Sequence, residues 1–472
     1  FFFKQKTAYE IRNCDWSSDV CSSDLDSVVM KGKDVVAPVY IYNYIGIKPG
    51  VTYNESKVSR ISVRLRELPF LSESRSNEIV FSEKNTKLLL YLEPRKASQF
   101  DGVLGVAPDN AGKVVLTGEA HLKLQNALRR GEVIELNWKQ LAAKTQDLKV
   151  HALYPYLLNT PLGIDGNLSI YKQDTTYIDV IKNLGVQYMF NGTNFIKAFV
   201  NDKESSLLST KALESQTVLP DYADINITSY GLTLHFEKLD YRYNPRKGFV
   251  IETSPSTGNR IIKKNGDLNP VIYEGLNLKT TQYHFDFSGD YFIQKDFSSW
   301  MVSGGLSGNI FFFHDDGLQG THIGNFGAAF FQFEKNWKKI RLEAGGRYET
   351  FRLDTMTENS RPVGRFGINY SPDKKIFFRS SYGQGFRFPS PAERFVNYSL
   401  GDIHIYPNPT LLPEKGWSAE IGVRKKAGNE KLSGYTDWAV FLEGYHNMLE
   451  FTFGQWGKPT DPLIGQIGRA HV

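Results

Sequence analysis

The sequence lacks a long apolar run, an excess of charge of one sign, and cysteine beyond its first residues. No stretch approaches the roughly 18 apolar residues that a transmembrane helix needs, so helical membrane spans are excluded. The two cysteines, Cys14 and Cys21, both lie near the start, which leaves no disulfide framework for the rest. The formal net charge is only +5 and is spread along the chain, so we expect no nucleic-acid partner.

Aromatic residues and glycine are abundant instead. The 472 residues include 32 Phe, 25 Tyr and 7 Trp, far too many for a disordered chain. The 41 Gly beside them favour many short strands joined by turns. The length suits two or three soluble domains, or one large barrel with a small attachment.

Both ends of the chain read as translated sequencing adapter. Residues 466–472 spell QIGRAHV, which back-translates to DNA resembling the start of a common adapter. Residues 15–25 spell DWSSDVCSSDL and back-translate in the same way. We therefore expect residues 1–25 and 466–472 not to be native, which removes both cysteines and leaves the net charge unchanged.

Residues 26–97 predict a small α/β module. Residues 35–44 are rich in Val, Tyr and Ile and predict a strand, which Lys48, Pro49 and Gly50 end in a turn. Asn54 is expected to cap a helix that Pro69 terminates, in which Val58, Ile61, Leu65 and Leu68 recur at helical spacing. Residues 78–82 and 87–92 predict two further strands.

From residue 98 onward the sequence alternates apolar and polar side chains. Ile134, Leu136 and Trp138, for example, alternate with Glu135, Asn137 and Lys139, and the pattern continues to about residue 465. We count roughly sixteen to eighteen such segments, many about 10 residues long, the length of a tilted bilayer-spanning strand. A soluble sandwich and an outer-membrane barrel both fit alternation on this scale.

Charges and aromatics favour the barrel over the sandwich. Charged side chains occupy the inward positions, where a soluble core would not tolerate them unpaired: Lys123, Glu135, Arg341, Glu343 and Arg379. Aromatic side chains sit near segment ends, as interfacial girdles require: Tyr154, Tyr156, Tyr188, Phe190, Tyr241, Tyr243, Tyr291, Phe292, Trp337 and Tyr348. The predicted fold is mainly β, a transmembrane antiparallel β-barrel with a small N-terminal α/β module.

The first part of the chain resembles the BamA-like surface-antigen and secretion family. Lys48-Pro49-Gly50, residues 68–71 (LPFL) and residues 92–95 (LEPR) resemble a POTRA module, and residues 100–106 (FDGVLGV) resemble the first barrel strand of that family. Residues 243–249 (YNPRKGF) add to the match. The resemblance implies a periplasmic module at 26–97 and assembly-factor barrel strands at 98–296, which would bind unfolded outer-membrane protein clients.

The second part, residues 297–465, resembles the barrel of TonB-dependent receptors. Residues 382–395 (YGQGFRFPSPAERF) and 407–422 (PNPTLLPEKGWSAEIG) carry this resemblance. It implies a receptor that binds a small nutrient outside the cell and imports it with the TonB complex. Four charged positions in these motifs are candidate lumen or plug contacts, against the alternative of plain surface charge: Arg387, Glu393, Glu414 and Glu420.

Both resemblances are incomplete in the printed residues. The Val/Ile-Arg-Gly-Phe/Tyr motif of BamA-like proteins is absent, and so are a plug and an energy-coupling box. We therefore expect a chimera, in which parts of two genes meet near residues 290–300.

No motif predicts catalysis, a metal site or a cofactor. The histidines are scattered without the spacing of a zinc hydrolase, and no Gly-x-Ser-x-Gly elbow occurs. A loop cluster of His314, Asp315, Asp316 and His322 could chelate a cation, but a solvated loop is the commoner outcome.

The sequence thus predicts a non-enzymatic barrel in the bacterial outer membrane, in contact with its lipid, with the module in the periplasm. The favoured function is nutrient uptake of the TonB-dependent kind, and assembly or secretion of other β-rich proteins is the alternative. A passive adhesin or surface-antigen barrel and a soluble β-rich carbohydrate-binding or hydrolytic protein also remain open.

Overall fold

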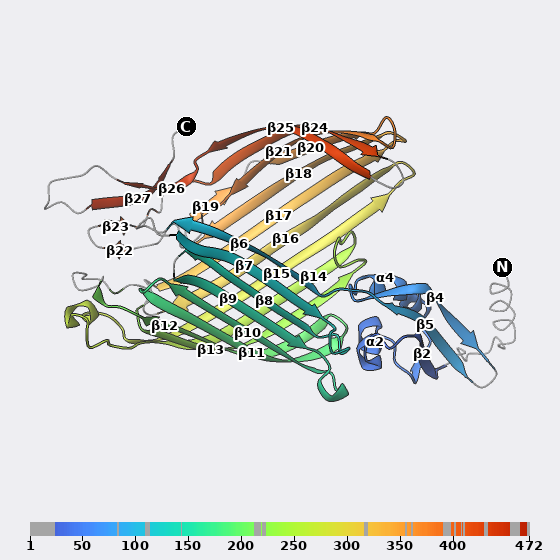
Figure 1. Cartoon of the computed structure of the whole chain (residues 1–472), viewed down its shortest axis with the longest axis horizontal. Helices are drawn as coiled ribbons and strands as arrows, with labels where there is room; N and C mark the ends of the chain where they lie inside the picture. The colour runs from blue at the N-terminus through green and yellow to red at the C-terminus, as the bar shows by residue number, and fades with distance from the viewer. Residues whose placement is uncertain are drawn as a thin grey trace.

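Figure 1 shows a small module beside a large barrel in a computed structural model of the chain. The structure describes residues 24–82, 85–108, 114–142, 144–211, 219, 223–315, 320–354, 356–359, 362–389, 398–400, 403–406, 408, 411–428, 433–453 and 463–469. Within these ranges, no helix combines the length and apolar character needed to cross a bilayer.

The module is built on a three-stranded sheet. Its strands are β2 (Ser27–Gly32), β5 (Thr86–Pro94) and β4 (Leu71–Phe81) in that order, with β2 parallel and β4 antiparallel to β5. The helices are α2 (Pro38–Ile45), α3 (Glu55–Val58) and α4 (Ile61–Arg66). The short strands β1 (Asp24–Leu25) and β3 (Val51–Thr52) pair with each other.

The strand predicted at 35–44 is wrong, because most of this segment forms helix α2. Pro38 stands in the first turn, where a helix does not use the missing N–H, and Gly46 ends the helix in the left-handed conformation at φ 70°. Ile41 and Ile45 on this helix are buried in the module core, and their burial outweighs the strand preference of the segment. The strand that completes the sheet is β2, earlier in the chain.

The turn and the cap form where the sequence predicts them, but the single helix predicted between Asn54 and Pro69 is divided into α3 and α4. Gly50 lies in a turn at φ 80°, and the side chain of Asn54 accepts a hydrogen bond from the Lys57 N–H at 3.1 Å. Leu65 is 1% exposed in the core. Leu25 packs in the same core at 2% exposure, so the folded module includes the last two residues of the segment attributed to adapter.

In the described residues, 17 antiparallel strands form the barrel wall, which confirms the predicted fold class and the expected number of segments. The wall strands are β6 (Gln99–Pro108), β7 (Val114–Gln125), β8 (Val133–Ala142), β9 (Thr145–Tyr154), β10 (Leu162–Gln173), β11 (Tyr177–Asn191), β12 (Asn194–Leu207), β13 (Ile225–Leu239), β14 (Gly248–Ile262), β15 (Lys279–Asp296), β16 (Trp300–Asp315), β17 (Gly320–Asn336), β18 (Ile340–Leu353), β20 (Val363–Tyr370), β21 (Ile376–Arg387), β24 (Glu414–Gly428) and β25 (Ser433–His446).

Smaller elements extend the ends of the wall. Strand β19 (Met356–Asn359) folds back on β18, and two 3-10 turns, η2 (Leu157–Asn159) and η4 (Pro270–Tyr273), lie in connections. Four short strands form a separate sheet: β22 (Tyr398–Leu400), β23 (Ile403–Tyr406), β26 (Leu449–Phe453) and β27 (Leu463–Arg469).

The two ends of the barrel differ in their connections. At the end beside the module, called the module end here, tight turns such as 297–299 and 337–339 join successive strands (Figure 1). At the opposite end, the loop end, long segments such as 208–224 and 388–413 separate the wall strands. The loop end also has tight turns such as 174–176, but the longest connections all lie there, and long loops at one end are typical of outer-membrane barrels.

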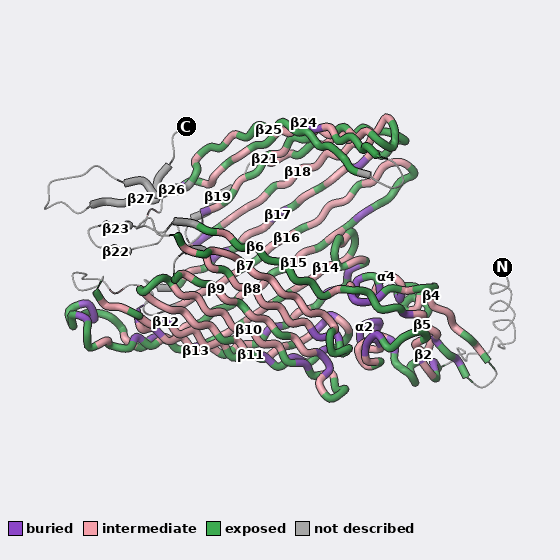
Figure 2. The backbone as a smooth tube through the Cα atoms, viewed as in Figure 1, coloured by how far each residue is buried: buried purple, intermediate pink, exposed green. Residues whose placement is uncertain are grey.

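The wall carries two chemically different faces. In β24, Trp417 and Ile421 point to the outer face, and Ile421 is 70% exposed. Glu420 and Arg424, on the other parity, pair with charges of neighbouring strands on the inner face. Figure 2 shows that the wall strands are mostly half-buried or exposed, whereas buried residues gather in the module and near strand ends. This is the inside-out pattern of a membrane barrel.

Strands β6 and β25 are the first and last strands of the wall and its most exposed strands. Phe100 on β6 and Trp438 on β25 are each 73% exposed, and both strands are green along most of their length in Figure 2. Side chains of both parities are exposed there, because each of these two strands pairs with only one neighbour in the described residues.

Candidate functional site

Paired charges line the inner face of β17 and β18. The Arg341 guanidinium on β18 lies 3.0 Å from Glu334 on β17 and 2.7 Å from Glu343 on its own strand. Register places Glu334 directly opposite Glu343, so the arginine neutralises two facing carboxylates. The inward charges Arg341 and Glu343 are thus paired, as is Lys123 with Glu135 on the opposite part of the wall.

A second network crosses β21, β24 and β25. Arg379 donates to Glu420 at 2.6 Å and to Asp437 at 2.7 Å, and Arg424 lies 2.7 Å from Asp437. Two cations and two carboxylates are balanced in this cluster. Because the strands are hydrogen-bonded neighbours, the backbone holds these four side chains in a fixed cross-strand arrangement.

The family-motif positions divide between two places on this wall. Arg387 at the end of β21 donates to Glu414 at the start of β24 at 2.7 Å, so the structure brings these two predicted residues together. Glu420 lies farther along β24 and joins the network of Arg379 instead. Glu393 lies outside the described residues.

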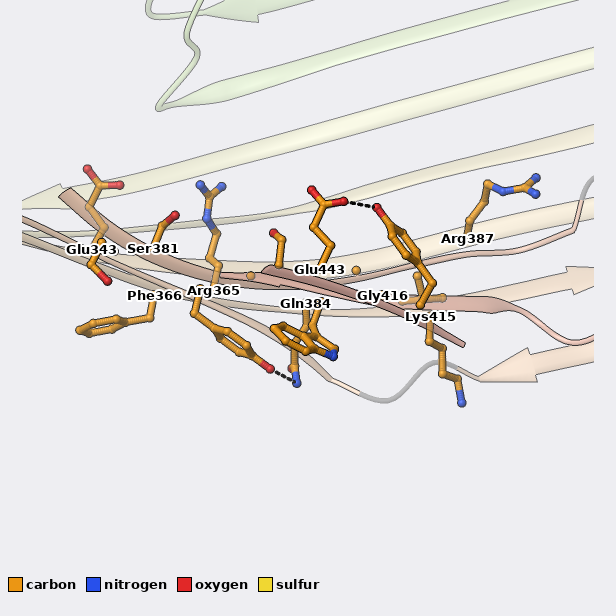
Figure 3. Close-up of a pocket in the computed structure, with 18 of the residues that line it drawn as sticks. Glu343, Arg365, Phe366, Ser381, Gln384, Arg387, Lys415, Gly416 and Glu443 are labelled. Carbon is orange, nitrogen blue, oxygen red and sulfur yellow. Dashed lines mark hydrogen bonds between the residues drawn. The ribbon is translucent and has the colours of Figure 1, made fainter. Parts of the chain in front are cut away.

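A cavity of about 660 Å³ follows the wall between these clusters. Figure 3 shows charged and polar side chains projecting to one side of the sheet: Glu343, Arg365, Ser381, Arg387 and Glu443. Phe366, Gln384 and Lys415 project to the other side. The hydroxyl of Tyr445 donates to Glu443 at 3.0 Å. The arrangement can hydrogen-bond a polar ligand or an inserted protein segment.

Histidines scattered in the sequence gather on the inner face of the other half of the wall, each beside a carboxylate. His121 lies 3.2 Å from Asp101, and His235 lies 2.8 Å from Glu252. Asp165 bridges His151 at 3.2 Å and Lys197 at 2.9 Å. Sequence reasoning missed these pairs, although His121, His151 and His235 all occupy the inward parity of their strands.

The predicted cation cluster near the loop end does not form a site in the described residues. No group of three potential metal ligands occurs there or elsewhere in those ranges. His314 contacts Thr321 at 2.8 Å, and His322 contacts Asp354 at 2.8 Å. Asp316 lies outside the described residues.

The predicted aromatic girdle is confirmed in part. Tyr188, Tyr291 and Trp337 are 44%, 48% and 54% exposed near the module end of the wall. Tyr156, however, is buried at 4% exposure against Tyr40 of the module, and Phe292 packs against Phe330 on the inner face. These two predictions are wrong, because strand-end position in the sequence does not reveal which face a side chain occupies.

A buried carboxylate joins the module to the barrel. Glu67 at the end of α4 is 2% exposed and accepts hydrogen bonds from the Tyr44 hydroxyl at 3.0 Å and from the Arg242 N–H at 2.9 Å. Arg64 lies 3.2 Å from the same carboxylate. Burial, followed by the nearby Glu67 charge, raises the pKa of Tyr44. Across the junction, the hydroxyl of Tyr243 donates to the Glu67 carbonyl at 2.9 Å.

The predicted turn residues lie beside this junction. Lys48, Pro49 and Gly50 follow α2, and the Gly50 N–H donates to the Leu25 carbonyl at 2.7 Å. Lys48 lines a cleft between the module and the wall strands. The turn therefore has a structural role, and its lysine faces a second candidate site.

An apolar outer face, a charged inner face and asymmetric connections define a bacterial outer-membrane β-barrel. The chain belongs to the family described as "TonB dependent receptor-like, beta-barrel", whose model matches residues 152–471. Members of this family are transporters, so the chain is not an enzyme. Its location is the bacterial outer membrane.

Relatives are similar over short stretches or in fold. "Hemoglobin-haptoglobin utilization protein B" of Neisseria meningitidis serogroup C is 32% identical over 89 residues, which is 18% of this chain and only 10% of that protein. CdiB from Acinetobacter baumannii aligns with 90% of this chain and 74% of its own, at 9% identity and a TM-score of 0.41. The siderophore receptor PirA from Pseudomonas aeruginosa aligns with 81% of this chain and 61% of its own, at 8% identity and a TM-score of 0.43.

Proposed function

We propose that the chain forms the barrel of a receptor that takes up a scarce nutrient across the outer membrane with energy from the TonB complex. The loop end would face the outside and receive the ligand, and the module end would face the periplasm. The observation that carries this proposal is the set of paired charges along the inner face of the family-matched strands.

Paired charges suit a wall against which another segment moves. Each ion pair in a wet lumen stabilises the protein by only about 0–1 kcal/mol, so its members can exchange partners at small cost. An inserted plug could therefore form and break contacts with Arg387, Glu414 and Glu420 without leaving buried charges unpaired. Together with Glu393, these three residues are the candidate lumen or plug contacts within the receptor motifs.

Heme is the first ligand to test, because an aligned relative is a hemoglobin-haptoglobin utilization protein. Bacteria that lack their own heme receptors and express this chain should grow on heme as the iron source only when TonB is intact. The Arg387→Gln variant should grow more slowly, whereas Lys425→Gln, which removes an outer-face cation of β24, should match the parent. Uptake that persists without TonB would indicate a passive barrel and refute the proposal.

A second function, assembly of other β-rich proteins, is favoured by the open edges of the module sheet. Strands β2 and β4 are the outer strands of that sheet, and register shifts interrupt β4 between Glu73 and Glu78. The regular edge of β2 is the better template for a client strand added by β-augmentation. A POTRA role predicts that a photo-crosslinker at Val29 captures an unfolded outer-membrane protein, and that one at Arg75 does not. Equal labelling at both positions would refute it.

We also propose that residues 26–290 and 298–465 derive from two genes, with adapter-derived residues at 1–25 and 466–472. Only the two sequence resemblances support this origin. The fold adds no support, since β15 and β16 pair across the junction without a register shift, and the family match also runs across it. Long-read sequencing of the source DNA across codons 280–310 tests it. The absence of a continuous molecule across the junction would show that the two parts were joined in error, whereas a continuous in-frame molecule would refute that error and leave a genuine gene fusion.

A further inference from the structure

A cleft of about 540 Å³ lies between the module and the outer side of the wall. Helix α2, the turn that follows it and helices α3 and α4 form one side. The ends of β11 and β13 and the turn before β12 form the other. Neither the inner-wall networks nor the Glu67 junction explains this cleft.

The cleft is strongly basic. Glu237 is the one acidic side chain among its lining residues. Five lining residues are cations: Lys48, Lys57, Arg60, Arg64 and Lys238. Glu237 is already engaged by Arg242 at 3.3 Å and His235 at 3.5 Å. Lys48, Arg60 and Lys238 are exposed, and their side chains have no ion pair or hydrogen bond with any described residue. The cleft therefore carries positive charge that the described part of the chain leaves unneutralised.

The same cleft has an apolar wall that continues the outer face of the barrel. Phe190 at the end of β11 and Phe236 near the end of β13 are 52% and 43% exposed and lie on the outer parity of their strands. Val51 of the module, 39% exposed, also lines the cleft. Lipid-facing aromatics thus meet lysine and arginine side chains at the module end, where the lipid band of the wall stops.

We infer that this cleft binds the phosphate headgroup of a phospholipid from the leaflet at the module end. The exposed cations would contact the phosphate oxygens, and the acyl chains would lie along Phe190 and Phe236. A soluble anion would use the cations but gain nothing from the apolar wall, so a lipid fits both halves of the cleft. Basic residues beside a lipid-facing surface are a general basis for headgroup binding. The headgroup would connect module and barrel at a point that protein contacts leave open.

The test is native mass spectrometry of the whole detergent-purified chain titrated with phosphatidylglycerol. We expect the parent to retain the lipid, and Lys48→Gln/Arg60→Gln/Lys238→Gln to bind it at least about tenfold more weakly. A matched triple variant, Lys31→Gln/Lys33→Gln/Lys87→Gln, removes equal charge from exposed module positions outside the cleft and should bind like the parent. Lys48→Arg/Arg60→Lys/Lys238→Arg keeps the charge and should also bind, which separates loss of charge from misfolding.

Two outcomes would overturn the inference. Equal lipid retention by the charge-removing triple and the parent would mean that any bound lipid lies elsewhere on the barrel. Full competition by millimolar inorganic phosphate, with no dependence on acyl chains, would identify a free-phosphate site instead. Neither readout uses nutrient uptake, so failure here leaves the proposed receptor function untouched.

Discussion

Replacing Glu67 with alanine should detach the module from the barrel. The substitution leaves the buried Tyr44 hydroxyl and the Arg242 N–H without their acceptor. Only the bond from Arg242 crosses from the barrel to the module, and a buried donor left unsatisfied costs about 1–3 kcal/mol, so the junction should lose about 1–3 kcal/mol. Since about 1.4 kcal/mol corresponds to a tenfold change in an equilibrium constant, the docked state should become at least about fivefold less populated relative to the undocked one.

Hydrogen exchange of the Arg242 amide measures this loss directly, because that N–H donates to Glu67. In Glu67→Ala its protection should fall by the same factor, together with that of helix α2. Glu93→Ala, which removes an exposed carboxylate from β5, is the control and should leave both unchanged. Glu67→Gln keeps an acceptor oxygen and should lie between. Parent-like protection of Arg242 in Glu67→Ala would refute the view that this carboxylate holds the junction.

Three further outcomes follow from the described contacts. Burial raises the pKa of Tyr44 above its ordinary value, so the folded state holds the phenol proton more tightly than the unfolded state does. The urea concentration at the unfolding midpoint should therefore be constant below about pH 10 and fall above it, and the fall should be less steep in Tyr44→Phe than in the parent. Leu65→Ala should lower the free energy of unfolding of the module by about 2–5 kcal/mol in urea titrations, and a loss below 1 kcal/mol would show that the site collapses. Arg387→Ala should change barrel stability by only about 0–1 kcal/mol in thermal melts in detergent, and a larger loss would contradict the picture of an exchangeable pair.

The barrel could be predicted because its signal is repeated in strand after strand. Segments such as β8, where Ile134, Leu136 and Trp138 alternate with polar residues, each predict one strand, and charges at the inward parity decide between lumen and core. The strand prediction for residues 35–44 was wrong because its signal was not repeated. There a single short segment had strand-type residues, and only its packing against the module core shows that Pro38 begins a helix.

Residues of the candidate site could be predicted only where they belong to a recognisable sequence motif. Arg387 and Glu414 stand out by family resemblance, and the structure pairs them. His121 and His235 carry no motif, and their carboxylate partners lie on neighbouring strands, so pairing appears only once register is known. The basic cleft was beyond sequence reasoning, because Lys48 and Lys238 are brought together by docking of the module rather than by any local pattern.

The strand count also determines how the two edges of the wall face each other. With 17 strands and antiparallel neighbours, the first strand β6 and the last strand β25 run in the same direction. Most bacterial single-chain barrels have an even number of strands, so that their first and last strands run antiparallel. In the described residues β6 pairs only with β7, and β25 pairs only with β24, so each keeps one edge without a backbone partner. Unpaired backbone N–H and C=O groups at a strand edge are a template for a further strand. The line between β25 and β6 should therefore be the part of the wall where another strand adds most readily.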